Sequence, residues 1–67
     1  MNNKSDMEKP RVVIDMEVTL KDGTKYIVED FQAIYFFDDI INVIGEYTYE
    51  FGKDEILFID TQDTRVF

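Results

Sequence analysis

The chain has 67 residues, with 15 acidic side chains against 7 basic ones and a formal net charge of −8. Phosphate backbones and anionic lipid headgroups attract lysine and arginine, so this balance argues strongly against direct binding of nucleic acid and also against binding of an anionic membrane surface. Cysteine and histidine are both absent, which excludes disulfides and the usual zinc sites and favours a cytoplasmic location.

The composition predicts a folded chain with a single domain. Hydrophobic residues make up 45% of the chain and aromatic residues 15%, which is too much for a disordered acidic sequence. A domain of this size buries only about 60% of its unfolded surface, and self-association is the remaining route to extra stability. Residues 1–10 are polar up to Pro10 and predict a flexible tail, so the predicted domain covers residues 11–67.

The first predicted strand covers residues 12–20, where apolar and polar side chains alternate. Asp15 and Glu17 point toward solvent, and the opposite face is apolar, with Val12, Ile14, Met16, Val18 and Leu20. Asp22 and Gly23 follow, and Asp-Gly between two alternating runs indicates a hairpin turn in which glycine takes a positive φ. The second strand of this hairpin is predicted over residues 25–29.

Residues 30–45 fit two interpretations. A helix could begin at Asp30 and end at Gly45. However, residues 34–37 and 40–44 are dominated by β-branched and aromatic side chains, and good helix formers are nearly absent between them. We therefore predict two strands joined by a tight turn at Asp38 and Asp39.

Two more strands are predicted over residues 47–51 and 56–59. The predicted fold class is all-β: a small five- to six-stranded antiparallel meander that curls into a barrel, because closure removes open sheet edges. The strand spacing is similar to that of small SH3-like or Sm-like barrels, a likeness that implies an architecture but no function.

Apolar residues are in surplus for one closed barrel of this size. Ile40 and Ile41 are adjacent, and residues 56–59 are apolar at consecutive positions, so both sides of each strand need cover. This surplus indicates a homodimer interface, a partner-binding patch, or cover supplied by the tails.

The residues needed for catalysis and metal binding are scarce. Ser5 is the only serine, and without histidine or cysteine neither a Ser-His-Asp nor a Cys-His arrangement can form. Asp60 and Asp63 resemble half of a calcium loop, but the glycine and distal glutamate of an EF-hand are missing, so we interpret them as solvated loop acids. We expect a non-enzymatic protein with no cofactor and no metal site.

Between Lys25 and Lys53 the chain has no positive charge but six carboxylates and most of its aromatic residues. Such a segment suits a basic protein partner, such as a nucleic-acid enzyme, which it would attract by electrostatic steering. Alternate residues on a strand lie about 6.8 Å apart, similar to the phosphate spacing of a nucleic-acid strand, so Asp15 with Glu17 and Glu46 with Glu50 could form phosphate-like rows. The predicted partner-binding residues are Asp15, Glu17, Glu29, Asp30, Asp38, Asp39, Glu46, Glu50, Tyr35, Phe37, Tyr47 and Tyr49.

The leading functional hypothesis is an inhibitor that engages a nucleic-acid-binding protein by imitating phosphate charge. Small acidic proteins of this type are frequent among phage and mobile-element products that block host defence. The alternative is a homo-oligomeric adaptor or interaction module with aromatic anchors, in which the negative charge only maintains solubility.

Overall fold

The computed structural model describes residues 10–67, and the predicted tail at residues 1–10 lies, except for Pro10, outside the described residues. The described chain forms β1 Val12–Leu20, β2 Lys25–Val28, β3 Ala33–Phe36, β4 Ile40–Ile44, β5 Thr48–Gly52, the 3₁₀ turn η1 Lys53–Glu55 and β6 Ile56–Val66. The predicted all-β class and antiparallel pairing are confirmed. Within residues 10–67, no helix is long and apolar enough to cross a membrane.

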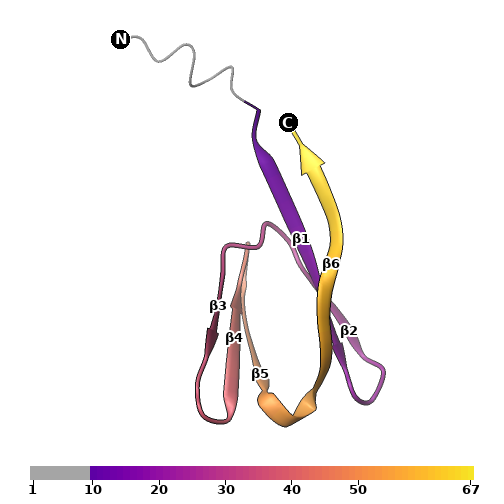
Figure 1. Cartoon of the computed structure of the whole chain (residues 1–67), viewed down its shortest axis with the longest axis vertical. Helices are drawn as coiled ribbons and strands as arrows, with labels where there is room; N and C mark the ends of the chain where they lie inside the picture. The colour runs from indigo at the N-terminus through magenta and orange to yellow at the C-terminus, as the bar shows by residue number, and fades with distance from the viewer. Residues whose placement is uncertain (1–9) are drawn as a thin grey trace.

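The strands form two three-stranded sheets, in the orders β2-β1-β6 and β3-β4-β5 (Figure 1). The predicted meander closing into an SH3-like or Sm-like barrel is wrong. Instead, β6 returns to pair with β1, and no ladder joins β2 to β3 or β5 to β6 among the described residues. The β1–β6 ladder shifts register between Asp15 and Met16 and again between Thr19 and Leu20. Asp30 takes a left-handed φ of 55° after β2, and η1 separates β5 from β6.

The hairpin predicted at Asp22 and Gly23 is confirmed. Gly23 has a φ of 95°, a conformation that glycine adopts without strain. The backbone N–H of Leu20 donates to the carbonyl of Thr24 at 2.8 Å and closes the turn. The Asp22 carboxylate accepts a 2.8 Å hydrogen bond from the Thr24 N–H, and this bond lowers the pKa of Asp22.

Residues 30–45 form strands rather than the alternative helix. β3 and β4 pair in an antiparallel register, and the Phe37 N–H donates to the carbonyl of Ile40 at 2.8 Å. This bond closes the predicted tight turn at Asp38 and Asp39. The β-branched and aromatic content of the segment therefore decided its conformation.

A small core lies between the two sheets, and its buried side chains are Val18, Val28, Ile41, Val43 and Phe51. The ring of Tyr26 meets Phe51 edge-on at 5.4 Å, and Tyr49 stacks on Phe51 at 6.2 Å. This aromatic cluster joins β2 of one sheet to β5 of the other. The core is small, as expected for a domain of 67 residues.

β1 and β6 extend beyond the other strands as a two-stranded ribbon (Figure 1). We call this ribbon the arm; it consists of residues 12–15 of β1 paired with residues 63–66 of β6. The strand predicted over residues 56–59 thus continues to Val66. The arm makes the molecule elongated, with a Cα radius of gyration of 15.0 Å, whereas a compact domain of this length has about 11 Å.

The predicted faces of β1 are correct near the core and wrong along the arm. Val18 is buried as expected, but Val13 and Asp15 are also buried, whereas Val12 and Ile14 are 58% and 39% exposed. The sheet of β3, β4 and β5 lies beside the other half of β1 and does not reach the arm (Figure 1). The Asp15 side is covered instead by the β2–β3 linker, where the Asp30 N–H donates to the Asp15 carboxylate.

Candidate functional site

Four carboxylates meet on one face of the neighbouring strands β1 and β6, with Glu17 opposite Asp60 and Asp15 opposite Asp63. Directly opposite residues in an antiparallel pair have Cβ atoms about 4.5–5.5 Å apart. Asp15 and Glu17 are alternate residues of β1 and therefore share a face. Asp60 and Asp63 are three residues apart on β6, and the register shift between Asp15 and Met16 is what sets both of them opposite the two acids of β1. We call Asp15, Glu17, Asp60 and Asp63 the acidic ladder.

The acidic ladder is electrostatically unfavourable in the free domain, because like charges directly opposite on neighbouring strands destabilise the pair. Glu17 is half-buried and Asp60 and Asp63 are exposed. Within residues 10–67, these three carboxylates form no ion pair. Lys25 of β2 lies opposite Thr19, diagonal to Glu17, and makes no ion pair with the opposed acids among residues 10–67.

Asp15 is the compensated member of the acidic ladder. It is only 6% exposed, and its carboxylate accepts hydrogen bonds from the Asp30 N–H at 3.0 Å and from Arg65 Nη2 at 2.8 Å. These bonds, the one from Asp30 first, hold the pKa of Asp15 below its ordinary value although burial acts in the opposite direction. The expectation that Asp15 faces solvent is therefore wrong.

Arg65 is the cation that faces the ladder. Its hydrogen bond to Asp15, together with the nearby charges of Glu29 and Asp63, raises the pKa of its guanidinium. The guanidinium also lies 5.7 Å from the ring centroid of Phe67. One side chain thus serves three carboxylates, which leaves most of their negative charge unbalanced.

A second group of predicted acids gathers where the β4–β5 turn meets the β2–β3 linker. The Glu46 N–H donates to the carbonyl of Glu29 at 2.7 Å, and Asp30 follows directly in the chain. Asp30 pairs with Arg11 at 3.5 Å, an exposed contact that contributes little stability. Glu46 lies in the turn before β5, so the predicted strand row of Glu46 with Glu50 does not form.

The other predicted acids lie apart from these groups. Asp38 and Asp39 occupy the β3–β4 turn and are exposed. Glu50 lies on β5 opposite Asn42, in the other sheet. The structure therefore divides the predicted acidic surface into separate groups, of which only the acidic ladder opposes like charges across a strand pair.

The predicted aromatic anchors do not form one patch. Tyr35, Phe37 and Tyr47 are 52%, 55% and 68% exposed. Phe37 lies at the β3–β4 turn and Tyr47 at the β4–β5 turn, which are opposite ends of the same sheet. Tyr49 is half-buried and stacks on Phe51 in the cluster between the sheets.

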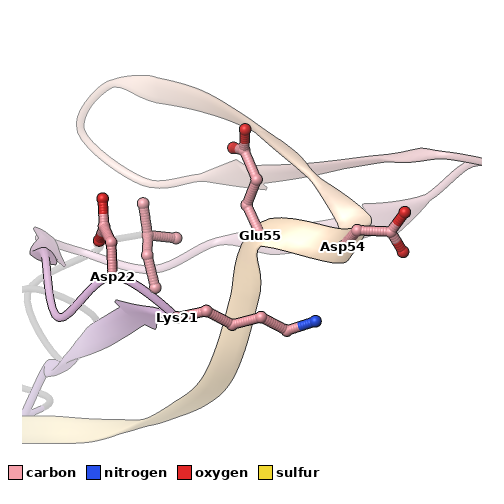
Figure 2. Close-up of a pocket in the computed structure, with 5 residues that line it drawn as sticks. Lys21, Asp22, Asp54 and Glu55 are labelled. Atoms are coloured by element: carbon pink, nitrogen blue, oxygen red, sulfur yellow. The ribbon is translucent and has the colours of Figure 1, made fainter.

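The surface hollows are open and lined by charged side chains. One of about 310 Å³ lies between the β1–β2 turn and η1, and its lining includes Lys21, Asp22, Asp54 and Glu55 (Figure 2). The carboxylates of Asp54 and Glu55 point in different directions (Figure 2). In the described part of the chain, no group of three or more acidic side chains could hold a metal ion. We therefore place the candidate site on the sheet face.

Two members of the acidic ladder, Asp60 and Asp63, were expected in a loop, and the structure places both on β6. The segment does carry a local strand signal, because several neighbours are β-branched: Thr61, Thr64 and Val66. No local signal, however, could show that β6 returns beside β1. Long-range pairing alone brings these acids against the carboxylates of β1.

The chain matches no protein-family model, no curated protein and no solved structure. Its function is therefore inferred from the geometry and charge of the described residues.

Proposed function

We propose that this chain is a non-enzymatic acidic binding protein and that the acidic ladder is its contact surface for a basic protein. The observation that carries the proposal is the register that sets Glu17 opposite Asp60, because Asp15 is buried and is already paired with Arg65. This opposition destabilises the free sheet, and lysine or arginine side chains placed over it would remove the repulsion. Binding would thus relieve a local electrostatic cost.

The proposed partner is a nucleic-acid-binding protein, and the proposed effect is inhibition. Glu17, Asp60 and Asp63 present negative charge on one sheet face, so a basic channel that accepts nucleic acid would attract the ladder. The net charge of −8 would steer the chain toward such a channel. Under this proposal the protein acts in the cytoplasm and does not itself bind nucleic acid. It would be an inhibitor of the kind that mobile elements direct against host defence.

The proposal is tested by titrating the chain with a fluorescent arginine-rich peptide and measuring fluorescence anisotropy at rising salt concentration. We expect binding that weakens as salt rises, because exposed charges are screened. The double variant Glu17→Gln/Asp60→Asn should bind roughly tenfold more weakly, which corresponds to about 1.4 kcal/mol. The chain should also displace duplex DNA from the same peptide.

The matched control is the double variant Asp38→Asn/Asp39→Asn, which removes the same amount of charge from the exposed β3–β4 turn. It should keep most of the affinity, because its carboxylates lie outside the ladder. An equal loss in both variants would show that net charge alone drives binding. No binding of the peptide at low salt would overturn the proposed function.

A second candidate function is an interaction module with an aromatic surface. The exposure of Tyr35 and Phe37 at 52% and 55% favours it, because exposed aromatic side chains are frequent interface anchors. The variant Tyr35→Ser/Phe37→Ser separates the two candidates. It should abolish partner binding only if the aromatic surface, and not the acidic ladder, makes the contact.

A further inference from the structure

We propose that the basic partner adds an extended segment as a new strand along the outer edge of β6, and that Asp60 and Asp63 cap this edge until the segment binds. This inference rests on the proposed function, because it describes how the basic protein is held. β6 is an end strand of its sheet and, among the described residues, pairs only with β1. Such an edge presents backbone N–H and C=O groups with which another chain can pair.

Backbone hydrogen bonds show which residues of β1 face β6. Arg11 and Phe67 exchange two backbone bonds, of 3.0 and 2.8 Å, so Arg11 faces the chain of β6. The Leu20 N–H donates instead to the carbonyl of Thr24 at 2.8 Å, on the side of β2. Because successive residues of a strand direct their backbone groups to opposite sides, odd-numbered residues of β1 face β6 and even-numbered residues face away from it.

The same alternation identifies the outward-facing residues of β6. Ile59 lies opposite Val18, and Thr61 lies opposite Met16. Both partners are even-numbered, so the backbone groups of these two β6 residues face the outer edge. Asp60, between them, directs its backbone groups to β1. The two register shifts of the β1–β6 ladder lie on either side of this segment, so it offers a regular edge to an added strand.

Two carboxylates of the acidic ladder cap this edge. The Thr61 N–H donates to the Asp60 carboxylate at 2.8 Å, and the Thr64 N–H donates to the Asp63 carboxylate at 2.9 Å. Each bond occupies a donor that an open edge would offer to any other chain, and charged side chains on an edge oppose unspecific pairing. Asp60 and Asp63 are exposed, so a cation of a partner can reach both carboxylates.

The caps select a basic segment. A residue opposite Asp60 on the added strand would share its face. This pair is of the non-hydrogen-bonded kind, in which the side chains approach most closely. A lysine or arginine at this position forms an ion pair that draws the carboxylate away from the Thr61 N–H. That N–H then donates to a carbonyl of the added strand, whereas an acidic segment leaves the cap in place.

The residues around Asp60 define the side-chain pattern of the segment. Phe58, which is 50% exposed, shares the ladder face with Asp60 and would contact the aliphatic stem of a second basic side chain. Ile59, on the opposite face, packs against the core cluster, so an apolar side chain beside it would extend the core. Neighbouring strands lie about 4.8 Å apart, so a lysine or arginine opposite Asp60 also extends toward Glu17 of β1. We therefore expect alternating basic and apolar residues.

Fluorescence anisotropy with a short labelled peptide of alternating lysine and valine tests the proposal at low salt. Two N-methylated forms of the peptide carry the same charge, one methylated on the backbone nitrogens of the valines and the other on those of the lysines. The valine N–H groups face β6 when a lysine lies opposite Asp60, so methylation of the valines should weaken binding roughly tenfold. Methylation of the lysines should have little effect. A peptide of alternating glutamine and valine should not bind, because it brings no cation to the caps.

Variants at Thr61 test the same edge from the side of the protein. Thr61→Pro removes an outward N–H and no hydrogen bond to β1, and edge strands tolerate proline at such positions. We expect it to bind the unmodified peptide roughly tenfold more weakly than Thr61→Ala, which keeps the N–H. Circular dichroism and urea unfolding compare the folds of the two variants. The methylated peptides are measured on the wild type, so the test does not depend on the folding of a variant.

Equal losses from the two methylated peptides, equal binding by the two folded Thr61 variants, or tight binding of the glutamine peptide would each overturn the proposal. If the lysine peptide still binds the wild type and binds Glu17→Gln/Asp60→Asn more weakly, the ladder remains the contact surface and only the edge pairing fails. Failure of the proposed function gives a different result, in which neither the lysine peptide nor the arginine-rich peptide binds at low salt.

Discussion

At the scale of single residues, Asp15 connects three parts of the chain. It lies on β1, accepts a hydrogen bond from the Asp30 N–H of the β2–β3 linker, and pairs with Arg65 of β6 at 2.8 Å. Asp30 has a left-handed φ of 55°. The carboxylate therefore stabilises an uncommon backbone conformation while it neutralises the guanidinium beside it.

The pH dependence of stability should report this role of Asp15. Its pKa is lowered in the folded state, so the unfolded state binds its proton more readily. The stabilisation is complete above the ordinary range of a carboxyl group and is lost as the pH falls through the folded-state pKa. We expect Asp15→Asn to be less stable than the wild type near neutral pH.

Urea unfolding of both proteins at a series of pH values measures the difference. The gap in unfolding free energy should narrow as the pH falls from about 5 to about 2. A gap that stays constant or widens on acidification would show that the charge of Asp15 does not stabilise the fold.

Sequence reasoning at this scale identified residue types but not their surroundings. The role of Gly23 in the turn was predicted because it depends on local chemistry. Glycine has no Cβ, so it adopts the positive φ that the hairpin turn requires. The burial of Asp15 depends on Arg65, which is 50 residues away in the chain. No local pattern around Asp15 distinguishes an exposed strand acid from one paired over such a distance.

At the scale of the elements, the β4–β5 turn packs closely against the backbone of the β2–β3 linker. A Cβ added at Gly45 would contact the Glu29 carbonyl oxygen and lie 2.7 Å from Val28 Cγ1. The Glu46 N–H donates to that same carbonyl. Glycine at this position lets the two sheets meet at this end of the core.

We expect Gly45→Ala to reduce the unfolding free energy by about 1–3 kcal/mol, as overpacking of a tight contact does. The control is Gly52→Ala, where the added Cβ would meet only the flexible Glu55 side chain, at 3.3 Å. Urea unfolding at neutral pH compares the two variants. Equal losses of stability would contradict a special role for the contact at Gly45.

The elements themselves were largely predictable, because their signals are local. The Asp22-Gly23 hairpin and the strands on either side of Asp38 and Asp39 follow from turn chemistry and β-branched content. The far half of β6 was missed because its polar side chains suggested a loop. Its conformation depends on pairing with β1, which is a tertiary interaction.

The whole molecule is an open, elongated pair of sheets of 49 × 22 × 14 Å rather than a closed barrel. The sheets do not pair with each other: the linker with Asp30 lies between β2 and β3, and η1 lies between β5 and β6. The sequence therefore predicted the class and most strands, but not the arm or the opposed carboxylates. Both features arise only when β6 lies beside β1 (Figure 1).

The account rests on the claim that the free sheet carries repulsion between Glu17 and Asp60, which a cationic partner would relieve. The most direct test is the unfolding free energy of Glu17→Gln/Asp60→Asn at low salt, measured without any partner. We predict an increase of roughly 0.2–1 kcal/mol over the wild type, because opposed like charges destabilise a strand pair. The gain should shrink at high salt. An unchanged or lower unfolding free energy would contradict the claim.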